Sequence, residues 1–214
     1  MDATVAVDAV RTVGPHTVAI ELETPAGFEA EPGQFVKLAA TVDGEEYARF
    51  YTLSSPDVAG TFEVTVEVDP EEGGPFSEHL VGLAAGDELD LSGPFGSSFY
   101  DGESRAVVLA GGPGVGPAVG IAERALAEGN EAAVVYLDDE HAHTERLDAL
   151  ADDGAAVALA AADADLTAHA ADAVTAAAGE QVFVYGFAAF VDRAREAIAA
   201  AGGDPEAAKV ENFG

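Results

Sequence analysis

Between residues 5 and 91, hydrophobic and polar positions alternate in short runs that turn residues separate. In residues 61–68 every even position is hydrophobic and every odd position is Thr or Glu. Successive side chains of a strand point to opposite faces, so this run predicts a strand with one buried face and one solvent-exposed face. Asp43-Gly44 separates two further runs, residues 35–42 and 45–53, and favours a hairpin between them. We therefore predict an antiparallel β-barrel for this part of the chain.

After Arg105 the period of the pattern changes. Residues 106–110 form a continuous apolar run, typical of a buried parallel strand, and a glycine-rich turn and a helical stretch at 118–128 follow. Further strands are expected at 132–137, 155–160, 182–185 and 209–213, and further helices at 144–151, 166–178 and 188–201. This alternation predicts an α/β domain with a parallel sheet. The predicted organisation is two domains, residues 1–98 and 103–214, with a linker across residues 97–104.

The chain carries 40 acidic and 9 basic residues, a formal net charge of −31 over 214 residues. Because 49% of the residues are hydrophobic, this charge does not indicate a disordered chain. We interpret it as a halophilic adaptation to molar salt, where the Debye length is about 3 Å and repulsion between surface carboxylates is screened. Unfolding should then begin as salt is removed, and an unchanged melting temperature from molar to millimolar salt would contradict this. The same charge disfavours binding to nucleic acid or to an anionic membrane.

The chain has no cysteine, which excludes disulfides, iron–sulfur clusters and thiolate zinc sites within it. No apolar run reaches the length of about 18 residues that a membrane span needs. Met1-Asp2 is followed by neither a basic region nor an apolar core, so no signal peptide is expected, and we predict a cytoplasmic protein. His141-x-His143 follows three acidic residues, but with no further ligands in register a solvated turn is predicted instead of a metal site.

The segment from Arg49 to Ser55 combines a cation, an aromatic residue and several hydroxyls on one predicted strand and its exit. Arg49, Tyr51 and Leu53 share one face of the strand, and Phe50, Thr52 and Ser54 share the other. A cation, an aromatic plane and hydroxyls suit a phosphorylated, planar cofactor. The alternative is an ordinary barrel strand with an exposed arginine, because strands favour Tyr, Thr and Phe in any case.

Two glycine-rich turns are further candidates for nucleotide binding. Gly73-Gly74-Pro75-Phe76-Ser77 precedes a predicted helical turn at 77–83 with Ser77 as its N-cap, and free N–H groups at a helix start favour an anion. Residues 111–117 depart from the ordinary dinucleotide fingerprint, because Pro117 stands where the third glycine belongs. The alternatives are a capped surface helix for the first turn and tight packing of strand against helix for the second.

Together these segments resemble the ferredoxin–NADP reductase family, in which a flavin-binding barrel precedes a pyridine-nucleotide domain. The resemblance covers nearly the whole chain. The motifs that carry it are Arg49-x-Tyr51-Thr52 with Leu53-Ser54-Ser55, Gly74-x-x-Ser77, Gly93-Pro94-Phe95-Gly96, Gly111-Gly112-x-Gly114-Val115-Gly116-Pro117 and Glu211-x-Phe213. The resemblance implies FAD as the cofactor and NADH or NADPH as the co-substrate.

The resemblance also implies roles for individual residues of the barrel. Arg49 would pair with a flavin phosphate, Tyr51 would lie against the isoalloxazine ring, and Thr52 would donate toward flavin N5. Backbone groups of Thr65, Val66 and Glu67 would border the flavin. The remaining residues expected to bind FAD are Phe50, Ser54, Gly74, Pro75, Phe76 and Ser77.

In the second domain, the resemblance implies a nicotinamide site and two residues near flavin N5. Phe213 corresponds to the terminal aromatic residue that covers the flavin until nicotinamide displaces it, and Glu211 is a candidate proton carrier. The residues expected to bind the pyrophosphate of the nicotinamide cofactor are Gly112, Pro113, Gly114, Val115, Gly116 and Pro117.

Two places depart from the family pattern. Tyr185-Gly186-Phe187-Ala188 replaces the usual Cys-Gly-Pro-Pro, so two aromatic residues would narrow or close the nicotinamide slot. NADPH-using relatives place Arg or Ser after the positions of Asp138-Asp139 and Ala162-Asp163, and no cation stands there in this chain. Acidic residues there would repel a 2′-phosphate and accept from a 2′-hydroxyl, which favours NADH.

Our leading hypothesis is a flavoprotein oxidoreductase that transfers hydride from NADH to FAD and electrons onward to a ferredoxin, a flavodoxin or a similar acceptor. One alternative is a flavin-bound electron-transfer or redox-sensing subunit whose nicotinamide slot is blocked by Tyr185 and Phe187. Another is a nucleotide-binding module without flavin, which a yellow purified protein would contradict.

Overall fold

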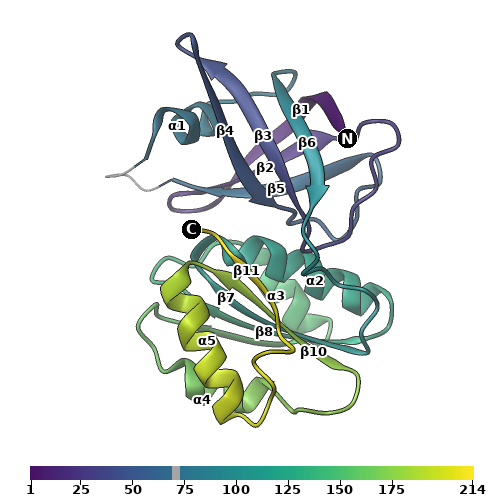
Figure 1. Ribbon diagram of the computed structural model, residues 1–214, viewed down its shortest axis with the longest axis vertical. Coiled ribbons are helices and arrows are strands. Elements are labelled where there is room, and N and C mark those ends of the chain that lie inside the picture. Colours follow the sequence, from purple (N-terminus) through teal and green to yellow (C-terminus); the bar gives the residue numbers. More distant parts are fainter. Residues whose placement is uncertain (69–72) are drawn as a thin grey trace.

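The computed structural model describes residues 1–68 and 73–214 and shows two domains, with the chain's C-terminus at their junction (Figure 1). The first domain holds a six-stranded antiparallel sheet with the order β4-β3-β6-β1-β2-β5. Its elements are β1 (Asp2–Gly14), β2 (Thr17–Glu23), β3 (Phe35–Val42), β4 (Glu45–Thr52), β5 (Thr61–Glu67), α1 (Pro75–Val81) and β6 (Glu88–Phe95). The predicted hairpin is confirmed, since β3 and β4 pair antiparallel on either side of Asp43-Gly44.

The second domain is a five-stranded parallel sheet with the order β11-β10-β7-β8-β9. Its strands are β7 (Arg105–Gly111), β8 (Glu131–Leu137), β9 (Ala156–Ala160), β10 (Glu180–Gly186) and β11 (Lys209–Asn212). Its helices are η1 (Gly112–Gly114), α2 (Val115–Ala127), α3 (Thr144–Asp152), α4 (Leu166–Ala173) and α5 (Ala188–Ala200). Helices α2 and α3 pack on one face of the sheet, and α4 and α5 on the other (Figure 1). The predicted fold class, an antiparallel β-barrel followed by an α/β domain, is confirmed.

The polar face of β5 differs from the prediction. Glu63 and Thr65, which the alternation places in solvent, are each only 6% exposed. A Cβ added to Gly116 of α2 would come within 2.6 Å of Thr65 Oγ1, and one added to Gly120 within 2.9 Å of the Ser55 carbonyl oxygen. The second domain therefore covers this face of the barrel, and the two glycines let α2 approach it closely.

Helices α1, α2 and α4 depart from their predicted bounds by two or more residues, and α2 begins at Val115 instead of residue 118. Helix α1 begins at Pro75 with Gly74 as its N-cap, so the prediction of Ser77 as N-cap is wrong. Helix α4 ends at Ala173, because the Glu180 carboxylate accepts hydrogen bonds from the backbone N–H groups of Thr175 and Ala176. These bonds satisfy groups that would otherwise continue the helical ladder.

The segment predicted as a linker forms no helix or strand, but it packs against both domains. Tyr100 is buried and its backbone N–H donates to the Pro32 carbonyl. The Lys209 ammonium donates to the Phe99 carbonyl at 2.6 Å. Through these contacts, the segment between the domains binds to both of them. Among the helices of residues 1–68 and 73–214, none has the length and apolar character needed to cross a membrane.

Candidate functional site

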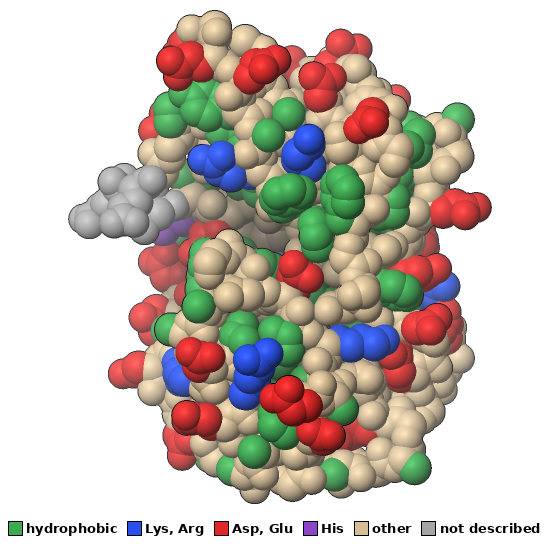
Figure 2. All heavy atoms as spheres, in the orientation of Figure 1, with side chains coloured by type: hydrophobic (Ala, Val, Ile, Leu, Met, Phe, Trp, Pro, Cys, Tyr) green, Lys and Arg blue, Asp and Glu red, His purple; other side chains and the backbone are tan. Residues whose placement is uncertain are grey.

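A cavity of about 520 Å³ lies where the two domains meet. The first domain contributes Phe35, Arg49, Phe50, Tyr51, Thr52, Thr65, Glu67 and Ser77, and the second contributes Pro113, Pro117, Phe187, Glu211, Asn212 and Phe213. Figure 2 shows the surface hollowed between the domains, with basic and hydrophobic side chains along the border of the barrel. Sites for small molecules commonly have volumes of about 300–1,000 Å³, so this cavity is large enough for a nucleotide cofactor.

The cavity opens where the two edge strands of the barrel part. β4 and β5 are the edges of the sheet, and a bridge between Leu53 and Val64 joins them. Continuing this antiparallel register would place Thr52 opposite Thr65, and both side chains line the cavity. Residues opposite each other on antiparallel strands share one face, so the two hydroxyl groups can reach the same ligand.

The predicted flavin-binding segment lies on one wall of the cavity. Arg49, Phe50, Tyr51 and Thr52 all line it. The Arg49 side chain is exposed, and within the described residues its guanidinium makes one hydrogen bond, from Nη1 to the Ala48 carbonyl at 2.8 Å. Burial raises the pKa of the Tyr51 phenol to about 12, so it stays protonated at neutral pH. The wall therefore offers a cation, a neutral phenol and a hydroxyl.

Helix α1 brings one more hydroxyl to the cavity. Ser77, predicted as a cap, lies inside the helix, and its side chain lines the cavity. Phe76 instead packs in the barrel core, where its ring stacks with that of Tyr47 at 6.4 Å between centroids. Of the predicted segment 74–77, the structure thus brings Ser77 to the cavity and uses Phe76 for packing.

The glycine-rich turn of the second domain has a packing role that the sequence left as an alternative. A Cβ added to Gly114 would lie 2.2 Å from the Tyr185 carbonyl oxygen, and one added to Gly116 would collide with Thr65. Gly112 has a φ of 55°, in the left-handed region. Pro113 and Pro117 line the cavity. The turn therefore faces the cavity through its prolines and the neighbouring structure through two of its glycines.

The C-terminal segment closes the opposite side of the cavity. Glu211, Asn212 and Phe213 all line it. The Phe213 backbone N–H donates to the Gly186 carbonyl at 3.1 Å, and the Phe213 ring meets that of Phe187 edge-on at 6.1 Å. Burial raises the pKa of the Glu211 carboxyl above its ordinary value. Glu211 can therefore hold a proton at a higher pH than an exposed glutamate.

Tyr185 is not at the cavity, and the prediction that it stands in the nicotinamide slot is corrected. Its side chain is fully buried, and its hydroxyl donates to the Ser98 carbonyl in the segment between the domains. Tyr185 is therefore not among the residues that line the cavity. Of the two aromatic residues in Tyr185-Gly186-Phe187-Ala188, only Phe187 lines the cavity, and it is 54% exposed.

Several other predicted residues lie away from the cavity. The Asp138 carboxylate accepts from the Tyr136 hydroxyl at 3.0 Å. Ser54 is buried and donates to Glu63. The Val66 side chain packs in the barrel core between two lining residues, so the role predicted for its backbone stays a prediction. Phe35 and Asn212 line the cavity but were not predicted. No sequence signal marks Phe35, whereas Asn212 lies between two predicted residues.

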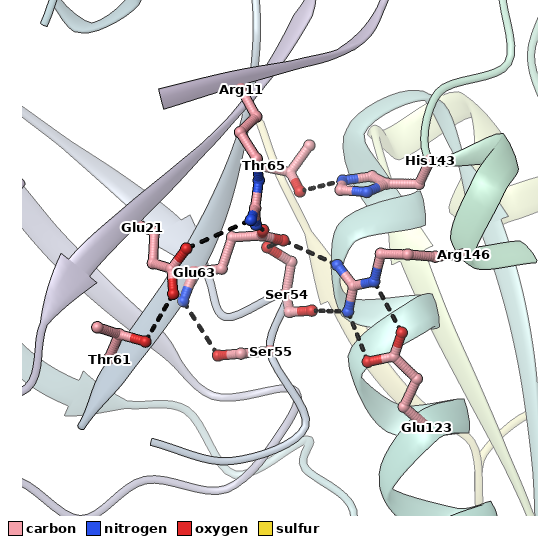
Figure 3. A network of polar contacts seen from close by, with 10 residues as sticks. All are labelled: Arg11, Glu21, Ser54, Ser55, Thr61, Glu63, Thr65, Glu123, His143 and Arg146. Carbon is pink, nitrogen blue, oxygen red and sulfur yellow. Dashed lines mark hydrogen bonds and ion pairs between the residues drawn. The ribbon is translucent and has the colours of Figure 1, made fainter. Parts of the chain in front are cut away.

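A network of ion pairs joins the domains beside the cavity (Figure 3). The Arg146 guanidinium of α3 donates to Glu63 Oε1 at 2.8 Å, to the Ser54 carbonyl at 2.6 Å and to both oxygens of Glu123 at 2.7 Å. Arg11 of β1 pairs with the other oxygen of Glu63 at 2.7 Å. Arg146 therefore links the barrel to α2 through paired, mostly buried charges.

His143 lies at the same junction, although its segment was predicted to be a solvated turn. Its side chain is 3% exposed, and its ring Nε2 lies 2.8 Å from Thr65 Oγ1 (Figure 3). Burial, with smaller contributions from Arg146 and Arg11, lowers the pKa of His143 to about 3. The prediction of a solvated turn is wrong for this histidine, because the turn after β8 packs against the barrel.

Comparison with known proteins identifies the first domain. Residues 5–100 match the family described as oxidoreductase FAD-binding domain. The matched residues make up the first domain and less than half of the chain, and they are similar to oxidoreductase FAD-binding domains. A likeness to the ferredoxin–NADP reductase family, predicted from the motifs, is thereby confirmed. The cation, phenol and hydroxyls at the cavity are donors that fit a flavin nucleotide.

Curated relatives match about half of this chain. The probable dihydroorotate dehydrogenase B (NAD(+)) electron transfer subunit of Methanopyrus kandleri is 37% identical over 109 residues, 51% of this chain and 38% of the relative. NADH-cytochrome b5 reductase 1 of Ajellomyces capsulatus is 36% identical over 116 residues, 50% of this chain and 37% of the relative. The matches thus span less than two fifths of either relative.

Solved structures share the fold over the full chain. The flavohem-like FAD/NAD binding domain of nitric oxide dioxygenase from Vibrio cholerae superposes with a TM-score of 0.84 and 20% identity, covering 99% of this chain and 98% of that one. The cytochrome b5 reductase domain of Ulva prolifera nitrate reductase gives 0.81 and 18% identity, covering 100% and 97%. At this level of identity, these comparisons show the fold.

Proposed function

We propose that this protein is a flavoprotein reductase that transfers hydride from a reduced nicotinamide nucleotide to FAD and passes electrons to a protein acceptor. The observation that carries the proposal is the shared cavity. Residues 49–52 of the FAD-binding domain and residues 211–213 of the α/β domain line the same volume. A two-domain reductase needs both nucleotides to meet at such a junction.

The barrel residues would bind and orient the cofactor. The exposed Arg49 guanidinium, held by one hydrogen bond to the Ala48 carbonyl, can turn toward a flavin phosphate. A hydrogen bond between charged groups contributes about 1.5–3 kcal/mol. The Tyr51 ring would lie along the isoalloxazine, and the Thr52 hydroxyl would donate toward N5. FAD, when bound, supplies the hydride acceptor and releases electrons one or two at a time.

The C-terminal residues would control access and protons. Phe213 lies at the cavity with its ring against Phe187, so it can cover the exposed flavin face until nicotinamide displaces it. Glu211 has a raised pKa because it is partly buried. A carboxyl group that holds its proton at higher pH suits proton delivery near N5.

NADH is the proposed nucleotide. Asp138 follows β8 and Asp163 follows β9, at the carboxyl ends of parallel strands, where nucleotides bind in such sheets. Carboxylates there would disfavour a 2′-phosphate. The ratio of flavin reduction by NADH to that by NADPH tests this choice, and a preference for NADPH would contradict it.

A second candidate function is an electron-transfer subunit whose nicotinamide slot is blocked. The position of Phe187 favours it, because the exposed ring lines the cavity beside Phe213. The relative from Methanopyrus kandleri is described as an electron transfer subunit. Replacement of Phe187 by Ser should then raise the rate of flavin reduction by NADH by more than tenfold, whereas an open slot predicts little change.

The test of the leading proposal is an anaerobic titration in molar salt. The purified chain, reconstituted with FAD, is mixed with NADH or NADPH, and the flavin absorption band is followed. We expect near-stoichiometric bleaching by NADH. A band that neither nucleotide changes would reject the proposal, and a chain that binds no FAD would reject it at an earlier step.

A further inference from the structure

His143 is a buried, titratable residue that the proposed function does not use. It belongs to the second domain but reaches the barrel, with ring Nε2 at 2.8 Å from Thr65 Oγ1. Its backbone is held on both sides, because its N–H donates to the Val13 carbonyl and its carbonyl accepts from the N–H groups of Arg146 and Leu147. The ring therefore has a fixed place at the junction of the domains.

The surroundings of the ring decide which nitrogen carries its hydrogen. Nδ1 is buried and has no hydrogen-bond partner among the described residues. If Nδ1 carried the hydrogen, a buried N–H donor would be left unpaired, which is costlier and rarer than an unpaired acceptor. The neutral ring is therefore protonated at Nε2, which donates to Thr65.

This assignment fixes the direction of the Thr65 hydroxyl. Its oxygen accepts from His143, so its own hydrogen remains to be donated elsewhere. Thr65 of β5 lines the cavity, as Thr52 of β4 does. In the described part of the chain, His143 is the one partner found for the Thr65 hydroxyl. The hydrogen can therefore point to a ligand in the cavity.

We propose that His143 is a positioning residue that donates from Nε2 to Thr65 Oγ1, so that the Thr65 hydroxyl donates to an acceptor atom of the bound flavin. The inference rests on the binding of FAD by the barrel, not on the nicotinamide step of the proposed function. Thr65 belongs to the region that matches FAD-binding domains, residues 5–100, which favours the flavin over the nicotinamide nucleotide as its ligand.

The first test uses the unmodified chain. Nitrogen NMR of isotope-labelled protein near neutral pH reports the tautomer of each imidazole, and comparison with His143→Gln assigns the signals of His143. We expect a neutral ring with its hydrogen on Nε2. A hydrogen on Nδ1, or a charged ring, would overturn the proposal.

The second test measures the flavin in variants, without any nicotinamide. Thr65→Val removes the hydroxyl and Thr65→Ser keeps it. His143→Asn tolerates the φ of 55° at this position but is too short to reach Thr65, and His143→Gln keeps a donor near Nε2. We expect Thr65→Val and His143→Asn each to weaken FAD binding about fivefold, the effect of one neutral hydrogen bond.

Thr65→Val and His143→Asn should also shift the flavin absorption band and the flavin reduction potential in the same direction. The double variant should shift neither quantity further than the single variants do. Thr65→Ser and His143→Gln should match the unmodified chain. The proposal is overturned if Thr65→Val leaves the flavin unchanged, if His143→Asn leaves it unchanged, or if their effects add. If His143→Asn does not fold, the tautomer and the pair of Thr65 variants decide. Normal flavin reduction by NADH with no such shift would reject this inference alone.

Discussion

The two edge strands of the barrel carry similar polar residues, yet the protein covers them differently. β4 displays Arg49 and Thr52 to an open cavity, whereas Glu63 of β5 is buried beneath the second domain. On β5, Glu63 pairs with two arginines and Thr65 bonds to His143. The difference shows that alternation identifies which residues leave the barrel core, while the partner domain decides which of them meet solvent, a ligand or a buried ion pair.

The largest expected effect comes from removing Arg146, the cation of α3 that pairs with Glu63 on β5, the edge strand covered by the second domain. Arg146→Met would leave Glu63 and Glu123 without their shared partner in a mostly buried site, which costs about 3 kcal/mol of unfolding free energy. Denaturant unfolding in molar salt measures it. Arg195→Met, on the exposed face of α5, is the control and should change stability by less than about 0.5 kcal/mol. Equal unfolding free energies for the two variants would contradict a stabilising role for the ion pairs of Arg146.

On β4, the edge strand that lines the cavity, we expect a similar loss of free energy, but in FAD binding instead of stability. Arg49→Met should weaken FAD binding by about 10- to 100-fold, since one charge-assisted hydrogen bond of about 1.5–3 kcal/mol is lost. Its stability without FAD should hardly change, because Arg49 is exposed. Titration of the variant with FAD measures the affinity. Lys37→Met removes the same charge from a residue outside the cavity lining and should bind FAD nearly as the unmodified chain does. If the two variants bound FAD equally, Arg49 would have no specific role.

Adding one methyl group to α2 at Gly116 should disturb its close contact with β5. Gly116→Ala would place Cβ 2.6 Å from Thr65 Oγ1, and overpacking of this kind costs about 1–3 kcal/mol. Thermal unfolding measures the loss. Gly82→Ala is the control, because its Cβ would meet its nearest neighbour at 3.5 Å, an ordinary contact distance. A Gly116→Ala chain as stable as the Gly82→Ala chain would mean that α2 does not press on β5.

The smallest effect is the pH dependence of the covered edge. The pKa of His143 falls from 6.5 to about 3 on folding, so between these values the unfolded chain binds a proton that the folded chain does not. The stability that the neutral ring contributes is therefore complete above about pH 6.5 and declines as pH falls. From pH 7 to pH 5.5, the unmodified chain should lose about 1 kcal/mol relative to His143→Asn, by urea unfolding at each pH. Parallel curves for the two proteins would contradict the buried neutral ring.

Much of the fold could be predicted from the sequence, because its signals are local. The period-two runs, the Asp43-Gly44 turn and the strand–helix alternation each specify one element. The family resemblance implied that residues 49–52, Glu211 and Phe213 lie near one flavin, and the structure brings them to one cavity. The burial of Glu63, Thr65 and His143 depends on contacts between the two domains, which a local sequence pattern does not predict. Tyr185 shows this, because its hydroxyl bonds to the segment between the domains.

The central claim is that flavin and nicotinamide meet in the cavity between the two edges and the C-terminal segment. The most direct measurement is single-turnover reduction of the bound FAD by NADH under anaerobic conditions, comparing the unmodified chain with Phe213→Ala. We predict bleaching whose rate saturates with NADH, and an altered NADH concentration at half-saturation when the covering ring is removed. A flavin that binds but is reduced in neither protein would contradict the claim.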